Sequence, residues 1–311
     1  MKNTILTTTL AALVAASSAW AQREERFHRT LDVGPDAALS IGNISGDIHV
    51  EGAAGSTIVI DAVKSVEDEE DAEMLKNVDI EVSQLGNRVR VSTEHTGRGR
   101  RHRGHDGNIS VSYRVTVPKG TEVEIQSVSG NVVLTGVAGA ANAQSVSGNV
   151  RVTDVAELVQ AKSVSGNVEV LRARSGRHAE VESVSGEVLV EDIEADELTV
   201  SSVSGDVRLQ GVSSRRASLK SVSGDLEYTG SIAASGRYDF QTHSGDVVLT
   251  IGDEVGFELK ASTFSGEIES DFDLETTSRA QKGKRLSAVV GDGSAVIETS
   301  TFSGDVQILR R

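Results

Sequence analysis

The sequence predicts an all-β fold, a single-stack β-solenoid built from parallel coils of about 19 residues with one short helix. Three observations support this prediction. A Ser-x-Ser-Gly unit recurs at nearly constant spacing, and apolar residues alternate with polar ones on both sides of it. The 31 Gly are accompanied by only 2 Pro and by 3% aromatic residues, which favours repeated tight turns over a large mixed core.

The repeat is visible from the spacing of its glycines. Successive units from Gly130 onward lie 18, 18, 20, 19, 19, 21, 21 and 38 residues apart, the last interval being two periods. An isolated copy, Asn-Ile-Ser-Gly, ends at Gly46. The units end at these positions: Gly46, Gly130, Gly148, Gly166, Gly186, Gly205, Gly224, Gly245, Gly266 and Gly304.

Apolar residues hold fixed positions around each glycine. Counting from the glycine as zero, they recur at −7, −5, −2, +2 and +4; around Gly205 these are Leu198, Val200, Val203, Val207 and Leu209. Alternation with period 2 indicates strands, and the odd step between −5 and −2 indicates a corner. We expect all five positions to face the core, with each coil burying its apolar residues against its neighbours.

The N-terminal residues have the pattern of an export signal. Lys2 precedes an apolar stretch, and Ala19-Trp20-Ala21 supplies a small-x-small cleavage site. We therefore expect a signal peptide over residues 1–21, and an exported mature chain in the periplasm, on the outer surface or outside the cell. No later segment is apolar enough to be a membrane span.

The mature chain divides into two predicted parts. Residues 22–126 hold N-terminal strands, the first coil, an acidic helix and a basic loop; residues 127–311 hold the regular solenoid. The expected elements of the first part are strands at 27–33, 58–63, 78–83, 88–93 and 111–117, and a helix at 67–76. Toward the C-terminus, the core positions enlarge to Phe240, Phe264 and Phe302, and a hairpin around Gly291-Asp292-Gly293 is expected to cover the end.

Two runs carry a resemblance to a known family. They are Val115-Thr116-Val117-Pro118-Lys119-Gly120, leading into the repeat that ends at Gly130, and Thr301-Phe302-Ser303-Gly304-Asp305-Val306 after Gly291-Asp292-Gly293. With these runs the chain resembles the bacterial putative-adhesin family, a domain of unknown function with β-solenoid repeats, over most of residues 35–310. The resemblance implies a solenoid and a role in adhesion, and it supplies no catalytic residue.

Composition excludes several classes of function. The formal net charge of −15 disfavours binding to nucleic acid. The absence of Cys excludes disulfides, thiolate catalysis and Cys-based zinc sites. The sequence has no phosphate-binding Gly-rich loop with Lys, no His-Glu-x-x-His pair and no Gly-x-Ser-x-Gly elbow. We therefore expect no enzyme and no cofactor.

A polar residue follows each motif glycine, which raises the question of a cation site. Stacked carboxylates of Asp206, Asp225, Asp246 and Glu267 are candidate calcium ligands. The alternative, which we favour, is turn chemistry, because Asn and Asp stabilise Gly-adjacent corners through backbone hydrogen bonds.

The basic loop is the second candidate site. Arg98, Arg100, Arg101 and Arg103 could hold phosphate or sulfate groups in bidentate pairs, or simply keep an exposed loop soluble. Nearby histidines and an aspartate have no common metal-site spacing; they are His95, His102, His105 and Asp106.

Together these features predict an exported, non-enzymatic and monomeric solenoid of the envelope or surface, which serves as an adhesin or as a binding or structural module. The candidate partner is an envelope or surface glycan or another anionic envelope component. Two alternatives stay open. One is a carbohydrate-active β-helix enzyme, a lyase or hydrolase, and the other is a self-assembling scaffold. Six nearly interchangeable units from Ser127 to Gly224 favour a structural or binding surface, because an enzyme site normally interrupts a repeat.

Overall fold

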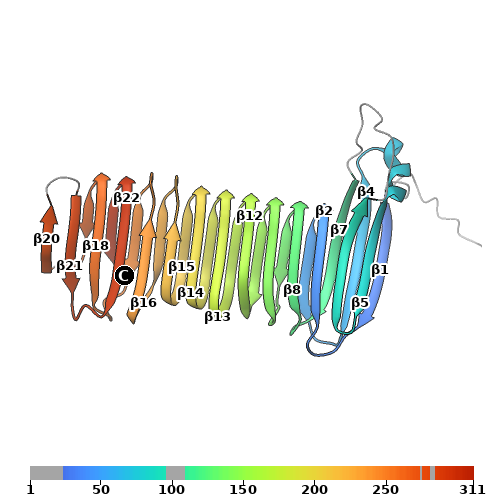
Figure 1. Cartoon of the computed structure of the whole chain (residues 1–311), viewed down its shortest axis with the longest axis horizontal. Coiled ribbons are helices and arrows are strands. Elements are labelled where there is room, and N and C mark those ends of the chain that lie inside the picture. The colour runs from blue at the N-terminus through green and yellow to red at the C-terminus, as the bar shows by residue number, and fades with distance from the viewer. Residues whose placement is uncertain (1–23, 96–108, 274, 281–283) are drawn as a thin grey trace, which may run out of the picture.

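The computed structural model describes residues 24–95, 109–273, 275–280 and 284–311. These residues form an elongated row of strands with one short helix (Figure 1), so the all-β prediction is confirmed. The predicted signal peptide, residues 1–21, lies outside the described residues. No helix among the described residues is long and apolar enough to cross a membrane.

Two sheet faces enclose the core. The leading face holds the strands that precede each motif glycine, and the trailing face holds those that follow it. Four long strands run through a corner and contribute to both faces: β13 (Val168–Ser185), β14 (Val188–Ser204), β15 (Val207–Lys220) and β16 (Leu226–Gln241).

The remaining strands extend each face toward the two ends of the molecule. In spatial order, the leading face begins with β5 (Val78–Leu85), β6 (Arg88–His95), β2 (Ala38–Ser45), β8 (Glu122–Ser129), β10 (Ala140–Ser147) and β12 (Glu157–Ser165), and after the long strands ends with β22 (Ala295–Ser303), β18 (Phe257–Ser265), β21 (Lys284–Val290) and β20 (Glu275–Ala280). The trailing face begins with β1 (Glu24–Asp32), β4 (Thr57–Val66), β7 (Ile109–Pro118), β3 (Ile48–Ala53), β9 (Val132–Thr135) and β11 (Val150–Val155), and ends with β17 (Val247–Ile251), β23 (Val306–Arg310) and β19 (Ile268–Ser270).

Most of the predicted core register is confirmed. Side chains at −7, −5, +2 and +4 point between the two faces; for the coil of Gly205, Leu198, Val200, Val207 and Leu209 are completely buried. Parallel pairing places equivalent residues side by side, as Val132, Val150 and Val168 are. These inward columns from both faces form one continuous hydrophobic cluster.

The prediction that position −2 faces the core is wrong. Val203 is 46% exposed, whereas its neighbour Ser202 at −3 is 4% exposed. The −3 hydroxyl turns inward because it donates a hydrogen bond to the glycine carbonyl of the preceding coil; Ser163 Oγ donates to the Gly148 carbonyl at 2.8 Å. Inward Ser and outward Val at this corner reverse the pattern that apolarity alone suggests.

The same error affects two of the three phenylalanines predicted to enlarge the core. Phe240, at −5, is 1% exposed as predicted. Phe264 and Phe302, at −2, are 69% and 49% exposed, so the prediction that they enlarge the core is wrong.

Close packing of neighbouring corners explains the glycine. Gly205 has a φ of +147°, and a Cβ built there would overlap the Gly186 carbonyl oxygen. A side chain at this position is therefore disfavoured for two reasons, the backbone conformation and the contact with the preceding coil.

The two ends of the row depart from parallel pairing. β1, β4 and β7 pair antiparallel at one end, as do β18, β21 and β20 at the other. The predicted hairpin around Gly291-Asp292-Gly293 is wrong, because β21 and β22 lie on opposite edges of β18. The last coil of the chain, β22 and β23, is thus inserted between the coils of Gly245 and Gly266.

The predicted acidic helix is present in a tighter form. Residues Glu69–Asn77 form a 3-10 helix, η2, between β4 and β5. Leu75 is buried and anchors it.

Candidate functional site

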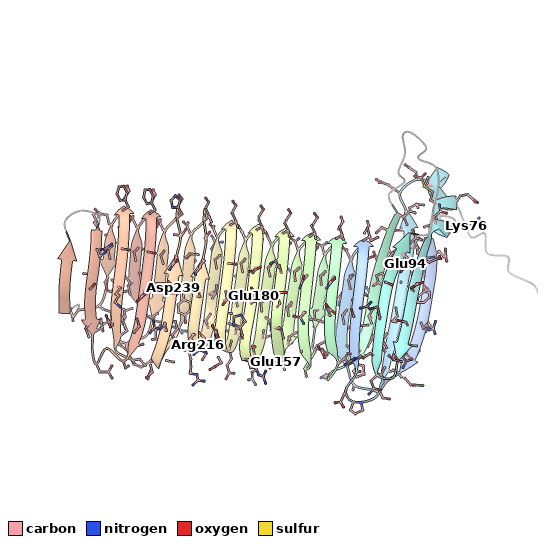
Figure 2. The ribbon with its side chains drawn as sticks, viewed as in Figure 1. Lys76, Glu94, Glu157, Glu180, Arg216 and Asp239 are labelled. Atoms are coloured by element: carbon pink, nitrogen blue, oxygen red, sulfur yellow. The ribbon has the colours of Figure 1, made fainter. Side chains whose placement is uncertain are left out.

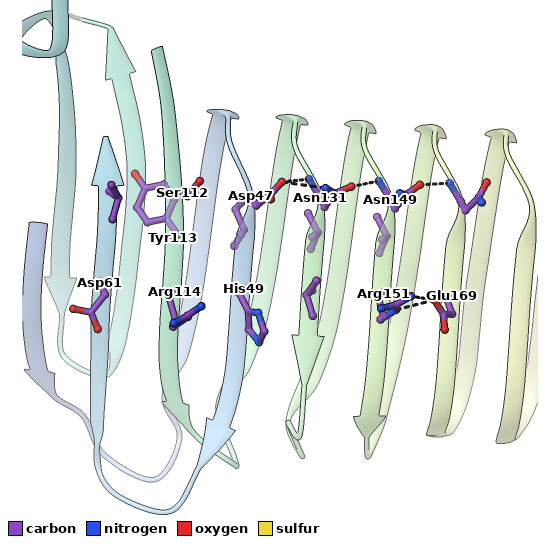
Figure 3. Close-up of a pocket in the computed structure, with 16 residues that line it drawn as sticks. Asp47, His49, Asp61, Ser112, Tyr113, Arg114, Asn131, Asn149, Arg151 and Glu169 are labelled. Carbon is purple, nitrogen blue, oxygen red and sulfur yellow. Dashed lines mark hydrogen bonds and ion pairs between the residues drawn. The ribbon is translucent and has the colours of Figure 1, made fainter. Parts of the chain in front are cut away.

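A groove of about 790 Å³ opens on the trailing face near its N-terminal end (Figure 3). Its floor is a row of outward side chains, one from each of several neighbouring strands. These side chains lie in line because each residue is the direct pairing partner of the residue on the next strand. In spatial order the row is Asp61 on β4, Arg114 on β7, His49 on β3, Val133 on β9, Arg151 on β11 and Glu169 on β13.

The charged residues of the row differ in their partners. Asp61 Oδ1 lies 2.7 Å from His28 Nδ1, and Arg151 Nε donates to Glu169 Oε2 at 2.7 Å. Arg114 has no ion pair or side-chain hydrogen bond with any residue that the structure describes. An exposed guanidinium with all its donors available therefore stands beside His49 in the middle of the row.

A line of amide and carboxylate side chains forms one wall of the groove. Each Oδ1 accepts the backbone N–H of the equivalent residue in the next coil: Asp47 from Asn131 at 2.8 Å, Asn131 from Asn149 at 3.0 Å, and Asn149 from Asn167 at 2.8 Å. These bonds join neighbouring coils at the corner, and Asn149 and Asn167 line the groove.

This arrangement suits the binding of an anion. Arg114, His49 and Arg151 present hydrogen-bond donors in one line, the geometry that a carboxylate or phosphate uses. The two floor carboxylates, Asp61 and Glu169, are separated by five strand spacings, about 24 Å. Glycosidases need their carboxylate pair within about 10 Å, so these two do not form such a pair.

The calcium candidates form a second hydrogen-bonded ladder of the same kind, which begins at Asp206 and does not line the groove. Asp206 Oδ1 accepts the N–H of Asp225 at 3.1 Å, and Asp225 Oδ1 accepts that of Asp246 at 2.8 Å. Asp305 lies between Asp246 and Glu267 in space and continues the ladder. The favoured turn chemistry is thus present, with each side chain bonded to the next coil instead of its own. Within the described residues, no three His, Asp or Glu side chains cluster as metal ligands; calcium binding by this column stays a hypothesis.

The other sequence candidates fall largely outside the described residues. Arg98, Arg100, Arg101 and Arg103 lie there, as do His102, His105 and Asp106. His95 is the last residue of β6.

Sequence reasoning missed the groove because its central residues come from three separate segments. Asp61, Arg114 and His49 become neighbours only through the antiparallel pairing of β4 with β7 and the parallel pairing of β7 with β3. A usable signal was present at His49 and Arg151, which both occupy the outward +3 position of their coils.

Comparison with solved structures finds similar chains of low sequence identity. A "putative lipid binding protein" from Parabacteroides distasonis is 14% identical, with a TM-score of 0.45, and the match covers 91% of this chain and 96% of that one. A "putative adhesin" from Parabacteroides merdae is 12% identical, with a TM-score of 0.41 and coverage of 92% and 96%. A "putative cell adhesion protein" from Clostridium sporogenes is 9% identical, with a TM-score of 0.24 and coverage of 92% and 100%.

No curated protein matches the chain, but one protein family does. The family described as Toastrack DUF4097 matches residues 39–309, which include every coil from Gly46 to Gly304 and the whole groove. The chain therefore belongs to the Toastrack DUF4097 family.

Proposed function

We propose that this protein is an exported, non-enzymatic binding module of the cell envelope that holds an anionic glycan in its trailing-face groove. The observation that carries the proposal is Arg114, an exposed guanidinium without a partner among the described residues, next to His49. Carboxylate or phosphate groups on a polysaccharide supply the acceptors that Arg114 lacks among the described residues.

The regularity of the scaffold supports binding over catalysis. Parallel pairing continues without a break from β2 to β18 on the leading face and from β7 to β19 on the trailing face. A glycan chain is itself a repeating polymer, and a straight row of strands offers it repeated contacts at a spacing of about 4.8 Å.

The charge balance makes the interaction local. The chain carries 46 acidic and 31 basic residues, so a polyanion is repelled at long range and attracted only where cations face it. Exposed contacts of this kind are screened beyond about 8 Å at physiological salt. Binding is therefore weak and falls as salt is raised.

The finer features of the sequence prediction belong to the same proposal. They are a single stack of coils of about 19 residues, the division at residues 126 and 127, cleavage after Ala21, export and a monomeric state. Arg98, Arg100, Arg101 and Arg103 are proposed as a second contact to the anionic partner, since β7, which follows this loop, also carries Arg114.

Affinity electrophoresis through gels containing polygalacturonate tests the proposal. We expect the parent to be retarded at low salt and less at high salt, and Arg114→Ser to lose most of the retardation. Arg237→Ser is the matched control, because Arg237 is also exposed and has no ion pair among the described residues. Equal retardation of Arg114→Ser and the parent would remove the groove from the proposal.

A further inference from the structure

An exposed apolar ridge runs along the corner of the solenoid, and the proposed groove does not use it. It consists of the residues at position −2. Nine of them are aliphatic or Phe and are between 37% and 69% exposed; the tenth, His243, is also exposed. Figure 2 shows a regular row of side chains projecting along this edge, with rings toward the C-terminal coils. The apolar members of this corner ridge are Ile44, Val128, Val146, Val164, Val184, Val203, Val222, Phe302 and Phe264.

The members are contiguous because the serines that follow them pair in register. Ser129 pairs with Ser147 and Ser147 with Ser165, and the series continues through Ser244 to Ser303. Ten positions at the strand spacing give a straight ridge of about 43 Å. Single exposed apolar residues are ordinary on a protein surface, but an unbroken row marks a surface that another molecule covers.

The ridge ends in an ordered aromatic stack. The rings of Phe264 and Phe302 lie 4.7 Å apart and within 4° of parallel, and His243 stacks on Phe302 at 5.0 Å. Phe264 belongs to the outermost parallel coil. Its other ring face, with the side chain 69% exposed, is available to a further group.

The surface beside the ridge is negatively charged. The polar residue that follows each motif glycine lies three residues after the ridge member of the same coil. Three residues of chain span at most about 11 Å. Asp225, Asp246 and Asp305 form a continuous series there, and none has a cationic partner among the described residues. On the other side of the ridge, the lysines Lys162 and Lys220 are already paired with Glu182 and Asp239.

We propose that the corner ridge is the docking surface for a cationic amphipathic polypeptide segment. Such a segment places an apolar face on the Val and Phe side chains and its Lys or Arg residues over Asp225, Asp246 and Asp305. A cation can also rest on the open face of Phe264. A second copy of this chain brings a formal charge of −15 to a negative surface, and an anionic lipid surface is repelled for the same reason.

Fluorescence anisotropy with three labelled synthetic peptides tests the assignment. The first is an amphipathic helix of Leu and Lys, the second replaces its Lys with Glu, and the third has the first composition in a scrambled, non-amphipathic order. We expect only the first to bind strongly, with an affinity that falls as salt is raised.

Two sets of variants locate the binding surface. Val146→Ser with Val203→Ser removes two apolar groups from the ridge, and Phe264→Ser removes its aromatic end. Val159→Ser with Leu85→Ser is the matched control, because both residues are exposed and apolar but lie off the ridge. We expect at least tenfold weaker binding for each ridge variant and no change for the control.

The charge contribution is tested separately by Asp225→Asn with Asp246→Asn. Asn keeps the Oδ1 acceptor that the corner ladder needs, as Asn131 and Asn149 do in their coils. The affinity should fall severalfold and depend less on salt, while the melting temperature stays the same.

Several results would overturn the proposal. Equal binding of the Leu/Glu and Leu/Lys peptides would show an apolar surface without charge selection, and unchanged binding by the ridge variants would place the peptide elsewhere. Light scattering that shows a dimer in the parent and a monomer in Val146→Ser with Val203→Ser would assign the ridge to a second copy. Flotation of the parent with zwitterionic lipid vesicles, lost in the same variant, would assign it to a lipid surface. Polygalacturonate retardation depends on Arg114 and not on the ridge, so failure of either proposal leaves the other standing.

Discussion

At the scale of single residues, the corner of each coil is determined by three neighbouring positions with different tasks. In most coils, glycine permits the close approach of the preceding coil, the −3 hydroxyl donates to the glycine carbonyl of that coil, and the residue after the glycine accepts a backbone N–H of the following coil. Ser145 Oγ, for example, donates to the Gly130 carbonyl at 2.9 Å, whereas the hydroxyls of Ser127 and Ser221, also at −3, lack such a bond within the described part of the chain. A buried carbonyl left without a donor costs about 1–3 kcal/mol, which explains why Ser or Thr occupies the inward position.

Gly205→Ala should be strongly destabilising. The new Cβ meets the Gly186 carbonyl and the backbone holds φ at +147°, so we expect a loss of about 2–4 kcal/mol in the free energy of unfolding. Gly42→Ala is the control, because a Cβ there has no atom within 4 Å and Ala reduces the freedom of the unfolded chain, a gain of about 0.5 kcal/mol. Urea unfolding of both variants measures the difference; equal midpoints would contradict the close packing.

We expect the protein to lose stability at alkaline pH because of its three buried tyrosines. Burial raises the pKa of Tyr113, Tyr228 and Tyr238 above the ordinary value. In the unfolded chain they ionise near pH 10, so the stabilisation is complete below that pH and is lost as pH rises above it. With three tyrosines the slope approaches about 4 kcal/mol per pH unit.

A spectrophotometric titration measures this effect. Tyrosinate absorbance should stay low through pH 10 and then rise together with loss of the folded circular dichroism signal. Tyr228→Phe should reduce the slope of stability against pH by about a third. Gradual ionisation near pH 10 in the folded protein would show that the tyrosines are accessible.

At the scale of strands and coils, much of the fold could be predicted from the sequence because the alternation is local and repeated. Apolarity alone correctly predicts that residues at −7, −5, +2 and +4 face the core. It fails at position −2, because Ser at −3 and Val at −2 offer two possible registers at the corner. The glycine carbonyl that selects between them belongs to the preceding coil, and sequence periodicity does not reveal it.

The spatial order of the C-terminal coils could not be predicted from the sequence either. β22 lies between β16 and β18, although β18 precedes it in the chain. The groove depends on a similar rearrangement, since β7 joins β4 to β3. Long-range pairing of this kind leaves no local signal, so the solenoid could be predicted whereas its ends and its groove could not.

The corrected register gives a prediction within one coil. Val168→Asp places a charge at a completely buried position and should cost about 3–5 kcal/mol. Val164→Asp makes the same substitution at 37% exposure and should change stability by no more than about 0.5 kcal/mol. Thermal and urea unfolding of the pair measure this; a Val164→Asp variant as unstable as Val168→Asp would restore the inward −2 position.

The carboxylate column gives a second prediction at this scale. If Asp206, Asp225 and Asp246 serve only to join neighbouring coils, millimolar calcium should leave the melting temperature unchanged, because an ion bound only by the folded state would raise it. Differential scanning calorimetry with and without calcium is the measurement. A rise that disappears in Asp206→Asn with Asp225→Asn would establish the column as a calcium site.

At the scale of the whole molecule, the protein presents two different surfaces on one row of paired strands. The groove offers hydrogen-bond donors to an anion, and the corner ridge offers apolar contact beside carboxylates. Antiparallel strands cover the N-terminal end of the trailing face and the C-terminal end of the leading face, an arrangement that disfavours end-to-end growth into a scaffold. Both surfaces run across strands that pair in register, so each suits an extended partner.

The central claim is that the protein binds an anionic glycan without cleaving it. It is tested most directly by measuring binding and cleavage in the same incubation. Protein is mixed with polygalacturonate at low salt, and bound polymer and newly formed reducing or unsaturated chain ends are measured in the same samples. The account predicts salt-sensitive binding by the parent, loss of that binding in Arg114→Ser, and no new chain ends in either sample. New ends that accumulate in proportion to protein concentration would show a lyase or hydrolase and contradict it.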